Sequence, residues 1–442
     1  MYRTLYRNTR TGLGLALLLS VGLVTACNRE EILQGERVDI RAPWGGGATV
    51  ENRAQPISLP GQSVNAAWTQ RQGTPGARPR HPSLSATPQL VWSAPIGAGD
   101  SRRARLTTDP VSADGRIFTL DAATRVQATS TAGDVIWATD VEPPRGARGS
   151  ASGGALTVSG NRLFVASAFA FVAALDASTG EELWRVDFDS PLTGSPAVQG
   201  DSVYLSGTDS TLWSLEAATG RIQWTLPGTP SITTIARGSA PAVADALVVF
   251  PTRAGELTAV RRSNGALTWS TVAAGRRTGA ALATIPAITG DPVVDGNRIY
   301  AANQSGRVFA LDARTGATIW SVEEGAYGPV WPVGGSIFLI SDQNRLMRLN
   351  ASDGAVIWAQ DLPLYTTDRV RRRLAIFPQH GPVLAGGRLW VASGDGVLRG
   401  FSPETGERVV ELPIPGGAAS GPIAVGGSLY VLGREGQLHA YR

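Results

Sequence analysis

The sequence has 442 residues, of which 43% are hydrophobic and 17% charged, and its 40 basic and 36 acidic side chains give a net charge of +4. This composition is too apolar and too nearly neutral for an intrinsically disordered chain. One cysteine excludes a disulfide framework and a multi-cysteine metal site, and three widely separated histidines argue against a zinc enzyme. All basic residues are arginines spread along the chain, so the small positive charge does not indicate nucleic-acid binding.

Residues 1–26 have the pattern of a secretory signal peptide. Arginines without any acidic residue precede an apolar stretch from Leu13 to Val24, which is too short to span a bilayer as a helix. The stretch ends in Val24-Thr25-Ala26-Cys27, which resembles the lipobox of bacterial lipoproteins. The resemblance implies cleavage before Cys27 and its acylation, which anchors a protein without a spanning helix. The alternative is an ordinary signal peptide with a chance cysteine.

The residue after the cysteine bears on location. In bacterial lipoproteins an aspartate there often retains the protein at the inner membrane, whereas this chain has Asn28. The resemblance therefore implies an outer-membrane location on the periplasmic face.

Residues 27–85 show no sustained periodicity and are rich in proline and glycine. This composition is typical of a flexible tether, which would let a folded domain stand off the bilayer. Trp68 interrupts the segment. We interpret it as an anchor that docks on the folded domain, with contact to a partner as the alternative.

From residue 86 to 442 the chain repeats a unit of about 45 residues. Each unit has a Pro-x-Val segment, two segments of alternating apolar residues and a fourth segment containing tryptophan, separated by glycine turns. Alternation of this kind predicts β-strands, and four short strands per unit predict a β-propeller. The tryptophan follows a turn glycine by four residues in six copies: Gly133/Trp137, Gly180/Trp184, Gly220/Trp224, Gly265/Trp269, Gly316/Trp320 and Gly354/Trp358.

The last two copies depart from this pattern. The seventh copy has Val410 where the others have tryptophan, and the eighth ends at Arg442 after three strands. Residues 89–93, with Trp92, form an unpaired fourth strand ahead of the first full unit. Joining the two ends predicts one all-β domain of eight four-stranded blades, the last closed by the N-terminal strand, with no open edge. We expect the repeated tryptophans to pack between neighbouring blades.

The signature from Ala177 to Trp184, Ala-Ser-Thr-Gly-Glu-Glu-Leu-Trp, resembles the pyrroloquinoline-quinone (PQQ) repeat. This repeat occurs in quinoprotein alcohol dehydrogenases and in the BamB family of outer-membrane lipoproteins. A lipobox followed by eight PQQ-like blades resembles the BamB family. Two local runs support that resemblance, Ser341–Met347 in the sixth blade and Arg237–Pro241 at the start of the fourth.

The resemblance implies a non-catalytic scaffold of the β-barrel assembly (BAM) complex. Such a protein binds the periplasmic POTRA domains of BamA, and contact with unfolded outer membrane protein precursors is also implied. By position, the family's docking residues fall on Arg237 and, as an apolar neighbour, Ile235. The acidic pair that the family has before its Pro-Val-Val run is absent here, where Asp291 alone lies close.

The rival interpretation is a PQQ-dependent dehydrogenase or a degenerate PQQ-binding protein. Such enzymes carry a cysteine pair over the quinone and carboxylate and amide ligands for a hard cation, and this chain has a single cysteine. Asp121, Asp176 and Asp312 recur after third strands, so we expect them to cap turns. We therefore predict no catalytic residue, metal or cofactor. A binding module for a sugar or another lipoprotein stays open as a third interpretation.

A basic loop is expected between the sixth and seventh blades. It contains Arg369, Arg371, Arg372 and Arg373. A cluster of this kind suits an acidic partner surface or lipid head groups, with a solvated loop as the alternative.

Overall fold

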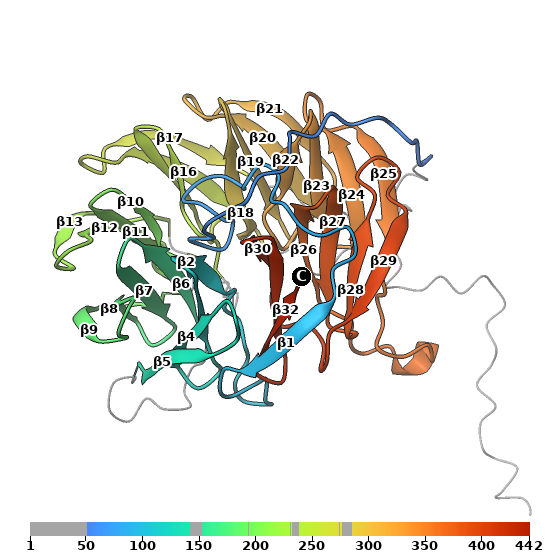
Figure 1. Ribbon diagram of the computed structural model, residues 1–442. Helices are drawn as coiled ribbons and strands as arrows, with labels where there is room; N and C mark the ends of the chain where they lie inside the picture. The colour runs from blue at the N-terminus through green and yellow to red at the C-terminus, as the bar shows by residue number, and fades with distance from the viewer. Residues whose placement is uncertain are drawn as a thin grey trace, which may run out of the picture. The chain divides into compact units, whose positions relative to one another are not determined.

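The computed structural model describes residues 51–141, 153–192, 194–229, 231, 238–273, 275 and 285–442 (Figure 1). Over these ranges the chain forms eight antiparallel sheets of four strands each, arranged as the blades of a propeller. This confirms the predicted all-β, eight-bladed fold. No helix in these ranges has the length and apolar character needed to cross a membrane.

The first four blades follow one another along the chain. Blade 1 contains β2 (Val111–Ala113), β3 (Arg116–Leu120), β4 (Arg125–Ser130) and β5 (Val135–Asp140). Blade 2 contains β6 (Gly154–Ser159), β7 (Arg162–Ser167), β8 (Phe171–Asp176) and β9 (Glu182–Asp187). Blade 3 contains β10 (Ala197–Gln199), β11 (Ser202–Ser206), β12 (Leu212–Glu216) and β13 (Ile222–Leu226). Blade 4 contains β14 (Ala242–Ala244), β15 (Leu247–Pro251), β16 (Glu256–Arg261) and β17 (Leu267–Val272).

The remaining blades complete the ring. Blade 5 contains β18 (Ile288–Asp295), β19 (Arg298–Asn303), β20 (Arg307–Asp312) and β21 (Thr318–Val322). Blade 6 contains β22 (Trp331–Val333), β23 (Ser336–Ile340), β24 (Arg345–Asn350) and β25 (Val356–Asp361). Blade 7 contains β26 (Gln379–Ala385), β27 (Arg388–Ser393), β28 (Val397–Phe401) and β29 (Arg408–Pro413). Blade 8 contains β30 (Ile423–Val425), β31 (Ser428–Gly433), β32 (Gln437–Tyr441) and β1 (Leu90–Pro95).

Blade 8 joins the two ends of the repeat region, as the sequence predicted. β1 pairs antiparallel with β32, with Trp92 opposite Ala440 and Ser93 opposite His439. The Ser93 hydroxyl lies 2.7 Å from Nδ1 of His439, which makes a side-chain hydrogen bond across the closing pair. The closing strand therefore completes blade 8 as a four-stranded sheet and joins the two ends of the repeat region.

The repeated tryptophan packs against the turn glycine of the next blade. Trp137 in blade 1 donates from Nε1 to the carbonyl of Ala177 in blade 2 at 3.1 Å. A Cβ added to Gly180 of that turn would lie 2.5 Å from Trp137 Cε3, so only glycine fits. This contact explains why the repeat contains both a tryptophan and a turn glycine, and it confirms that the tryptophans pack between blades. It recurs for Trp92, Trp184, Trp224, Trp269, Trp320 and Trp358.

The same contact explains the copy that lacks tryptophan. In blade 7 the position is held by Val410, and the next blade is blade 8. Blade 8 has no turn between its third and fourth strands, because β32 and β1 come from opposite ends of the repeat region. A tryptophan there would have no glycine turn to pack against.

The two faces of the propeller follow from strand alternation. The connections that lead into the first strand of each blade lie on one face, here called the upper face, together with the turns between second and third strands. Turns between first and second strands, and between third and fourth strands, lie on the lower face. The first strands surround the axis of the ring and line its channel.

Residues 51–85 differ from the flexible tether that the sequence predicted. They lie against the propeller, and Figure 1 shows them in blue across the middle of the ring. Their backbone makes hydrogen bonds to residues in or next to the first strands of blades 1, 2, 4, 5, 7 and 8, and Arg78 bonds carbonyls just before that of blade 6. These bonds involve Ser112, Val158, Val243, Val294, Gly386 and Gly426.

The proline- and glycine-rich sequence of this segment has no periodicity. Its backbone carbonyl groups nevertheless accept hydrogen bonds from residues in or next to the first strands. The role of residues 27–50, which lie outside the described residues, stays a prediction.

Candidate functional site

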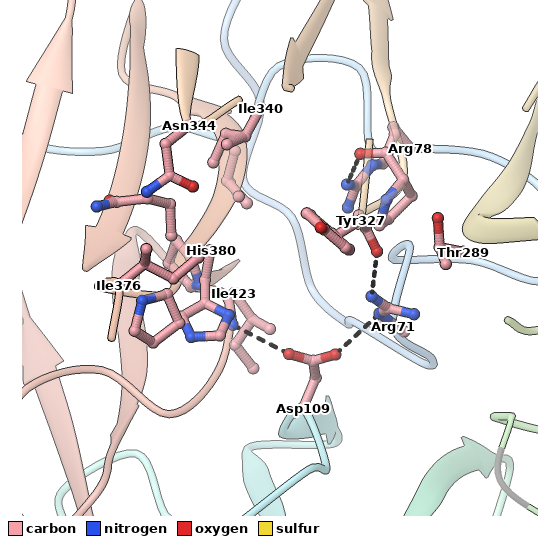
Figure 2. A pocket seen from close by; sticks show the side chains of 18 residues that line it. Arg71, Arg78, Asp109, Thr289, Tyr327, Ile340, Asn344, Ile376, His380 and Ile423 are labelled. Atoms are coloured by element: carbon pink, nitrogen blue, oxygen red, sulfur yellow. Dashed lines mark hydrogen bonds and ion pairs between the residues drawn. The ribbon is translucent and has the colours of Figure 1, made fainter. Parts of the chain in front are cut away.

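A cavity of about 310 Å³ lies in the channel, above the N-terminal segment (Figure 2). Its wall is mostly apolar and is formed in part by four aliphatic side chains, Ile340, Ile376, Val383 and Ile423. Most of its lining residues lie at or just before first strands, so the cavity faces the upper side of the propeller. The N-terminal segment closes it from below with Arg71 and Arg78.

Arg71 joins two carboxylates that are far apart in the sequence. Its Nε lies 3.2 Å from Asp109 Oδ2, and its Nη1 lies 3.1 Å from Asp291 Oδ1. Its Nη2 also donates to the carbonyl of Tyr327 at 3.3 Å. The side chains of Arg71, Asp109 and Asp291 are only 9%, 8% and 0% exposed, so these charges interact with little screening by solvent.

The two carboxylates are held by backbone groups as well. Asp291 accepts a hydrogen bond from the amide of Ala240 at 2.8 Å, and Asp109 accepts one from the amide of Gly421 at 3.0 Å. Arg71 therefore connects groups from the connections before blades 1, 4, 6 and 8 with the first strand of blade 5. Figure 2 shows Arg71 and Asp109 pointing toward each other across the channel.

Arg78 is a second buried cation from the same segment. Its guanidinium donates to the carbonyls of Pro329 at 2.9 Å and Val330 at 3.2 Å, and it lies 4.8 Å from the centre of the Trp331 ring. Burial lowers the pKa of Arg78 to about 9, although Asp291 acts in the opposite direction. The side chain therefore stays charged at neutral pH, and the carbonyl groups and the ring replace its hydration.

Trp68 is fully buried and fixes the start of this arrangement. Its ring lies 6.2 Å from that of Trp331, and its backbone forms two hydrogen bonds with Ser112 in β2. These contacts agree with the interpretation of Trp68 as a docking anchor.

The predicted partner-binding residues fall in two places. Ile235 and Arg237, which come between β13 and β14 in the sequence, lie outside the described residues, and so does Cys27. Asp291 lies in β18, next to the axis, and its buried carboxylate is bound to Arg71. A partner contact at Asp291 stays a prediction, and it would require Arg71 to leave.

The predicted basic loop is a projecting hairpin, residues 364–377, between β25 and β26 on the upper face. Tyr365 bridges Ile376, and the short 3-10 helix η2 (Val370–Arg372) forms its tip, drawn in orange outside the ring of blades in Figure 1. Asn344 donates from Nδ2 to the carbonyls of Pro363 and Phe377 and so holds the base of the hairpin. We call this element the basic hairpin.

The repeated aspartates cap turns, as predicted. Asp176 accepts hydrogen bonds from the amides of Ser178 at 2.8 Å and Thr179 at 3.1 Å. Its hydrogen bonds with Ser178 are the main cause of its lowered pKa. Asp312 accepts equivalent bonds in the corresponding turn of blade 5. Asp121 follows β3, the second strand of blade 1 and not a third strand as expected, and accepts bonds from the amides of Ala123 and Arg125 in the turn between β3 and β4. These carboxylates are structural.

The channel residues do not fit a quinone bound beside a calcium ion. The two carboxylates identified there, Asp109 and Asp291, are already paired with Arg71. In the part of the chain that the structure describes, no group of three or more His, Cys, Asp or Glu side chains is placed to hold a metal ion. The cavity suits neutral, largely apolar groups better than a tricarboxylate.

Sequence reasoning missed Arg71, Arg78 and Asp109. The two arginines lie in a segment without periodicity, whereas Asp109 precedes Pro110-Val111 at the same repeat position at which Asp291 precedes Pro292-Val293. Two signals were available, the Asp-Pro-Val run shared by blades 1 and 5 and Trp68, which the sequence analysis interpreted as a docking anchor.

Comparisons with known proteins show the family through a profile match and several curated relatives. The profile of the family described as outer membrane protein assembly factor BamB matches residues 122–360, which is more than half of the chain. BamB of Shewanella oneidensis is 27% identical over 364 residues, covering 79% of this chain and 88% of that protein. BamB of Escherichia coli is 25% identical over 359 residues, covering 80% and 88%.

Solved structures agree on the fold. The crystal structure of BamB from Moraxella catarrhalis matches with a TM-score of 0.66 and 18% identity, covering 80% of this chain and all of that one. A europium-containing methanol dehydrogenase matches with a TM-score of 0.63 and 15% identity, covering 83% and 89%. At these identities the structural likeness shows the propeller alone, whereas the family match separates the two kinds of PQQ-repeat protein. The chain, with its closed eight-bladed propeller, belongs to the BamB family of outer membrane protein assembly factors.

Proposed function

We propose that this protein is a non-catalytic scaffold of the BAM complex. In this proposal Cys27 is acylated and anchors the chain at the periplasmic face of the outer membrane. The propeller binds the POTRA domains of BamA and thereby assists the folding and insertion of β-barrel proteins, and it also meets their unfolded precursors. The observation that carries the proposal is the match of residues 122–360 to the BamB family.

The fold suits a scaffold. Neighbouring blades pack together through the tryptophan–glycine contact, or through apolar side chains between blades 7 and 8. The N-terminal segment in addition forms hydrogen bonds with the first strands around the axis. Such a ring holds the ends of its described strands in fixed relative positions. A partner that contacts several blades at once therefore meets a framework that loses little conformational entropy on binding.

We place the docking surface on the upper face, around the connection between β13 and β14 that carries Ile235 and Arg237. A cation there suits an acidic partner surface, and the neighbouring isoleucine adds apolar area to the contact. Asp291 is not required, because its carboxylate is engaged with Arg71.

The test is binding of residues 27–442, carrying Cys27→Ser, to the purified POTRA domains of BamA from the same organism. We expect saturable binding that Arg237→Glu weakens about tenfold or more, as for a charged residue at the centre of an interface. Arg314→Glu is the matched control, since it makes the same charge reversal at an exposed lower-face turn. An Ile235→Asp variant tests the apolar neighbour.

Two outcomes would overturn this placement. If Arg314→Glu weakens binding as much as Arg237→Glu, the effect reflects net charge and not a local contact. If a folded propeller shows no saturable binding, the proposal that it docks on the POTRA domains is wrong. Circular dichroism of each variant checks that the fold is intact.

A further inference from the structure

The basic hairpin exposes an unusual combination of side chains. Two aliphatic side chains are left in solvent near its tip, with Val370 65% and Leu374 84% exposed, whereas Ile376 at its base is 51% exposed and lines the channel cavity. Exposed aliphatic groups at the end of a projecting loop contribute nothing to the propeller core. Their grouping on one small element indicates contact with something outside the described residues.

The same element carries an excess of positive charge. Residues 364–377 contain four arginines and one aspartate. Arg369, Arg371 and Arg372 are exposed, and no described carboxylate forms an ion pair with any of them. Arg373 differs, since its guanidinium lies over the Tyr365 ring at 4.7 Å and stiffens the stem. The free cations therefore flank the aliphatic side chains at the tip.

We propose that the basic hairpin is a membrane-contact element that inserts Val370 and Leu374 shallowly into a bilayer containing anionic lipid. Aliphatic side chains gain from leaving water for the boundary between head groups and acyl chains. The arginine guanidinium groups stay at the level of the phosphates and bind them with charge-assisted hydrogen bonds. This contact goes beyond the proposed scaffold role and requires neither BamA nor the acyl chains on Cys27.

The size of the hairpin favours a bilayer over a protein partner. A stable protein interface uses about 20–30 residues on each side. The hairpin offers a tip of a few side chains that stands away from the blades (Figure 1), so on its own it presents far too little surface. Shallow insertion needs only a few apolar groups and cations, because the bilayer adapts to the inserted shape.

The hairpin is built to hold this position. The two arms of the hairpin are joined by hydrogen bonds, including one of 3.1 Å from the Thr366 amide to the Ala375 carbonyl. The side chain of Asn344 binds both sides of its base at 3.2 and 3.1 Å. Because the stem is fixed to blade 6, little conformational freedom is lost when the tip binds.

The experiment is co-sedimentation of residues 27–442, carrying Cys27→Ser, with vesicles of phosphatidylcholine that do or do not contain phosphatidylglycerol. This form keeps every described residue and removes the acylated cysteine. We expect binding to the anionic vesicles, weaker binding to the neutral ones, and a decrease as salt is raised. The double variant Arg371→Gln/Arg372→Gln should reduce the partition coefficient about 30-fold, since each arginine near an anionic surface contributes a factor of about five.

Matched controls separate a local contact from net charge and general hydrophobicity. Arg102→Gln/Arg103→Gln makes the same change in charge at another exposed upper-face connection and should leave binding unchanged. Leu374→Ser should reduce binding about tenfold, since partial burial of a leucine is lost. Val409→Ser, at a 51%-exposed valine on the outer strand of blade 7, should not.

Three results would overturn the proposal. The first is absence of binding to anionic vesicles at low salt by a chain shown to be folded. The second is an equal loss of binding in the Arg102/Arg103 control. The third is loss of POTRA binding in the hairpin variants with vesicle binding unchanged, which would make the hairpin a protein contact. Because the vesicles contain no BamA, failure here leaves the proposed scaffold function untouched.

Discussion

Replacing Arg71 tests how firmly the N-terminal segment is bound to the propeller. An Arg71→Ala variant leaves Asp291, whose side chain is fully buried, and Asp109, which is 8% exposed, without their shared cation. Removing one partner of a buried ion pair costs about 3–5 kcal/mol, because the remaining charge is left uncompensated in a poorly solvated site. We expect the free energy of unfolding to fall by about this amount.

The loss of unfolding free energy has an upper limit, which is the free energy that holds the N-terminal segment on the propeller. If leaving the carboxylates unpaired costs more than detaching the segment, the segment leaves the channel and water reaches both aspartates. Burial of the Trp68 ring alone contributes about 4–6 kcal/mol to docking, taking about 200 Å² of buried ring at 25 cal/mol/Å². The two magnitudes are similar, so the variant should show partial detachment as well as lower stability.

Two assays separate these effects. Urea unfolding followed by tryptophan fluorescence measures stability, and trypsin cleavage after Arg80 measures detachment, since Arg80 is retained in the variant. Adding Asp109→Asn and Asp291→Asn to Arg71→Ala should restore most of the stability, because neutral amides need no counter-charge. The control Arg53→Ala removes an exposed pair, 77% and 86% exposed, and should cost at most about 1 kcal/mol. If Arg71→Ala costs no more than Arg53→Ala and cleavage after Arg80 is no faster, the buried network does not hold the segment.

Three further predictions concern closure, blade contacts and cofactor. Burial lowers the pKa of His439 below its ordinary 6.5, so the unfolded chain takes up that proton first on acidification. The free energy of unfolding should therefore decrease as pH falls below about 6.5, and His439→Gln should flatten this part of the profile. Gly180→Ala should cost about 1–3 kcal/mol more than Gly160→Ala, because both have positive φ but only Gly180 faces a tryptophan ring, and urea unfolding measures both. Mixing the folded chain with PQQ and Ca²⁺ should leave the quinone absorption spectrum unchanged, and a shifted spectrum would favour the dehydrogenase interpretation.

The blades could be predicted from sequence because their contacts repeat. A tryptophan packs on a glycine turn in the next blade, so the same physical requirement recurs at a fixed spacing, as at Gly180 and Trp137. Closure was also predictable, since three strands at one end and one at the other complete a four-stranded blade. The absence of tryptophan at position 410 also follows from the absence of a turn in blade 8.

The channel could not be predicted, because its interactions occur only once. Arg71 meets Asp109 and Asp291, which hold the same position in blades 1 and 5, directly before a Pro-Val pair, but Arg71 itself lies in a segment that does not repeat. Many of the hydrogen bonds that dock residues 51–85 join backbone groups, which leave no pattern in side-chain identity. The proline-rich composition therefore suggested a tether. Asp291 was predicted to bind a partner, whereas the structure has it beside the axis of the ring.

The docking of residues 51–85 has a mechanical consequence. These residues lie immediately before β1, whose pairing with β32 closes the ring. A pull applied from the N-terminal side would otherwise act directly on that pair and peel the closing strand from its sheet. Here the load first meets a segment bound to first strands around the axis, with Trp68 and Arg71 buried among them. The docked segment therefore takes up force that is applied from the N-terminal side. The pairing of β1 with β32 stays intact under that force, so the propeller does not open.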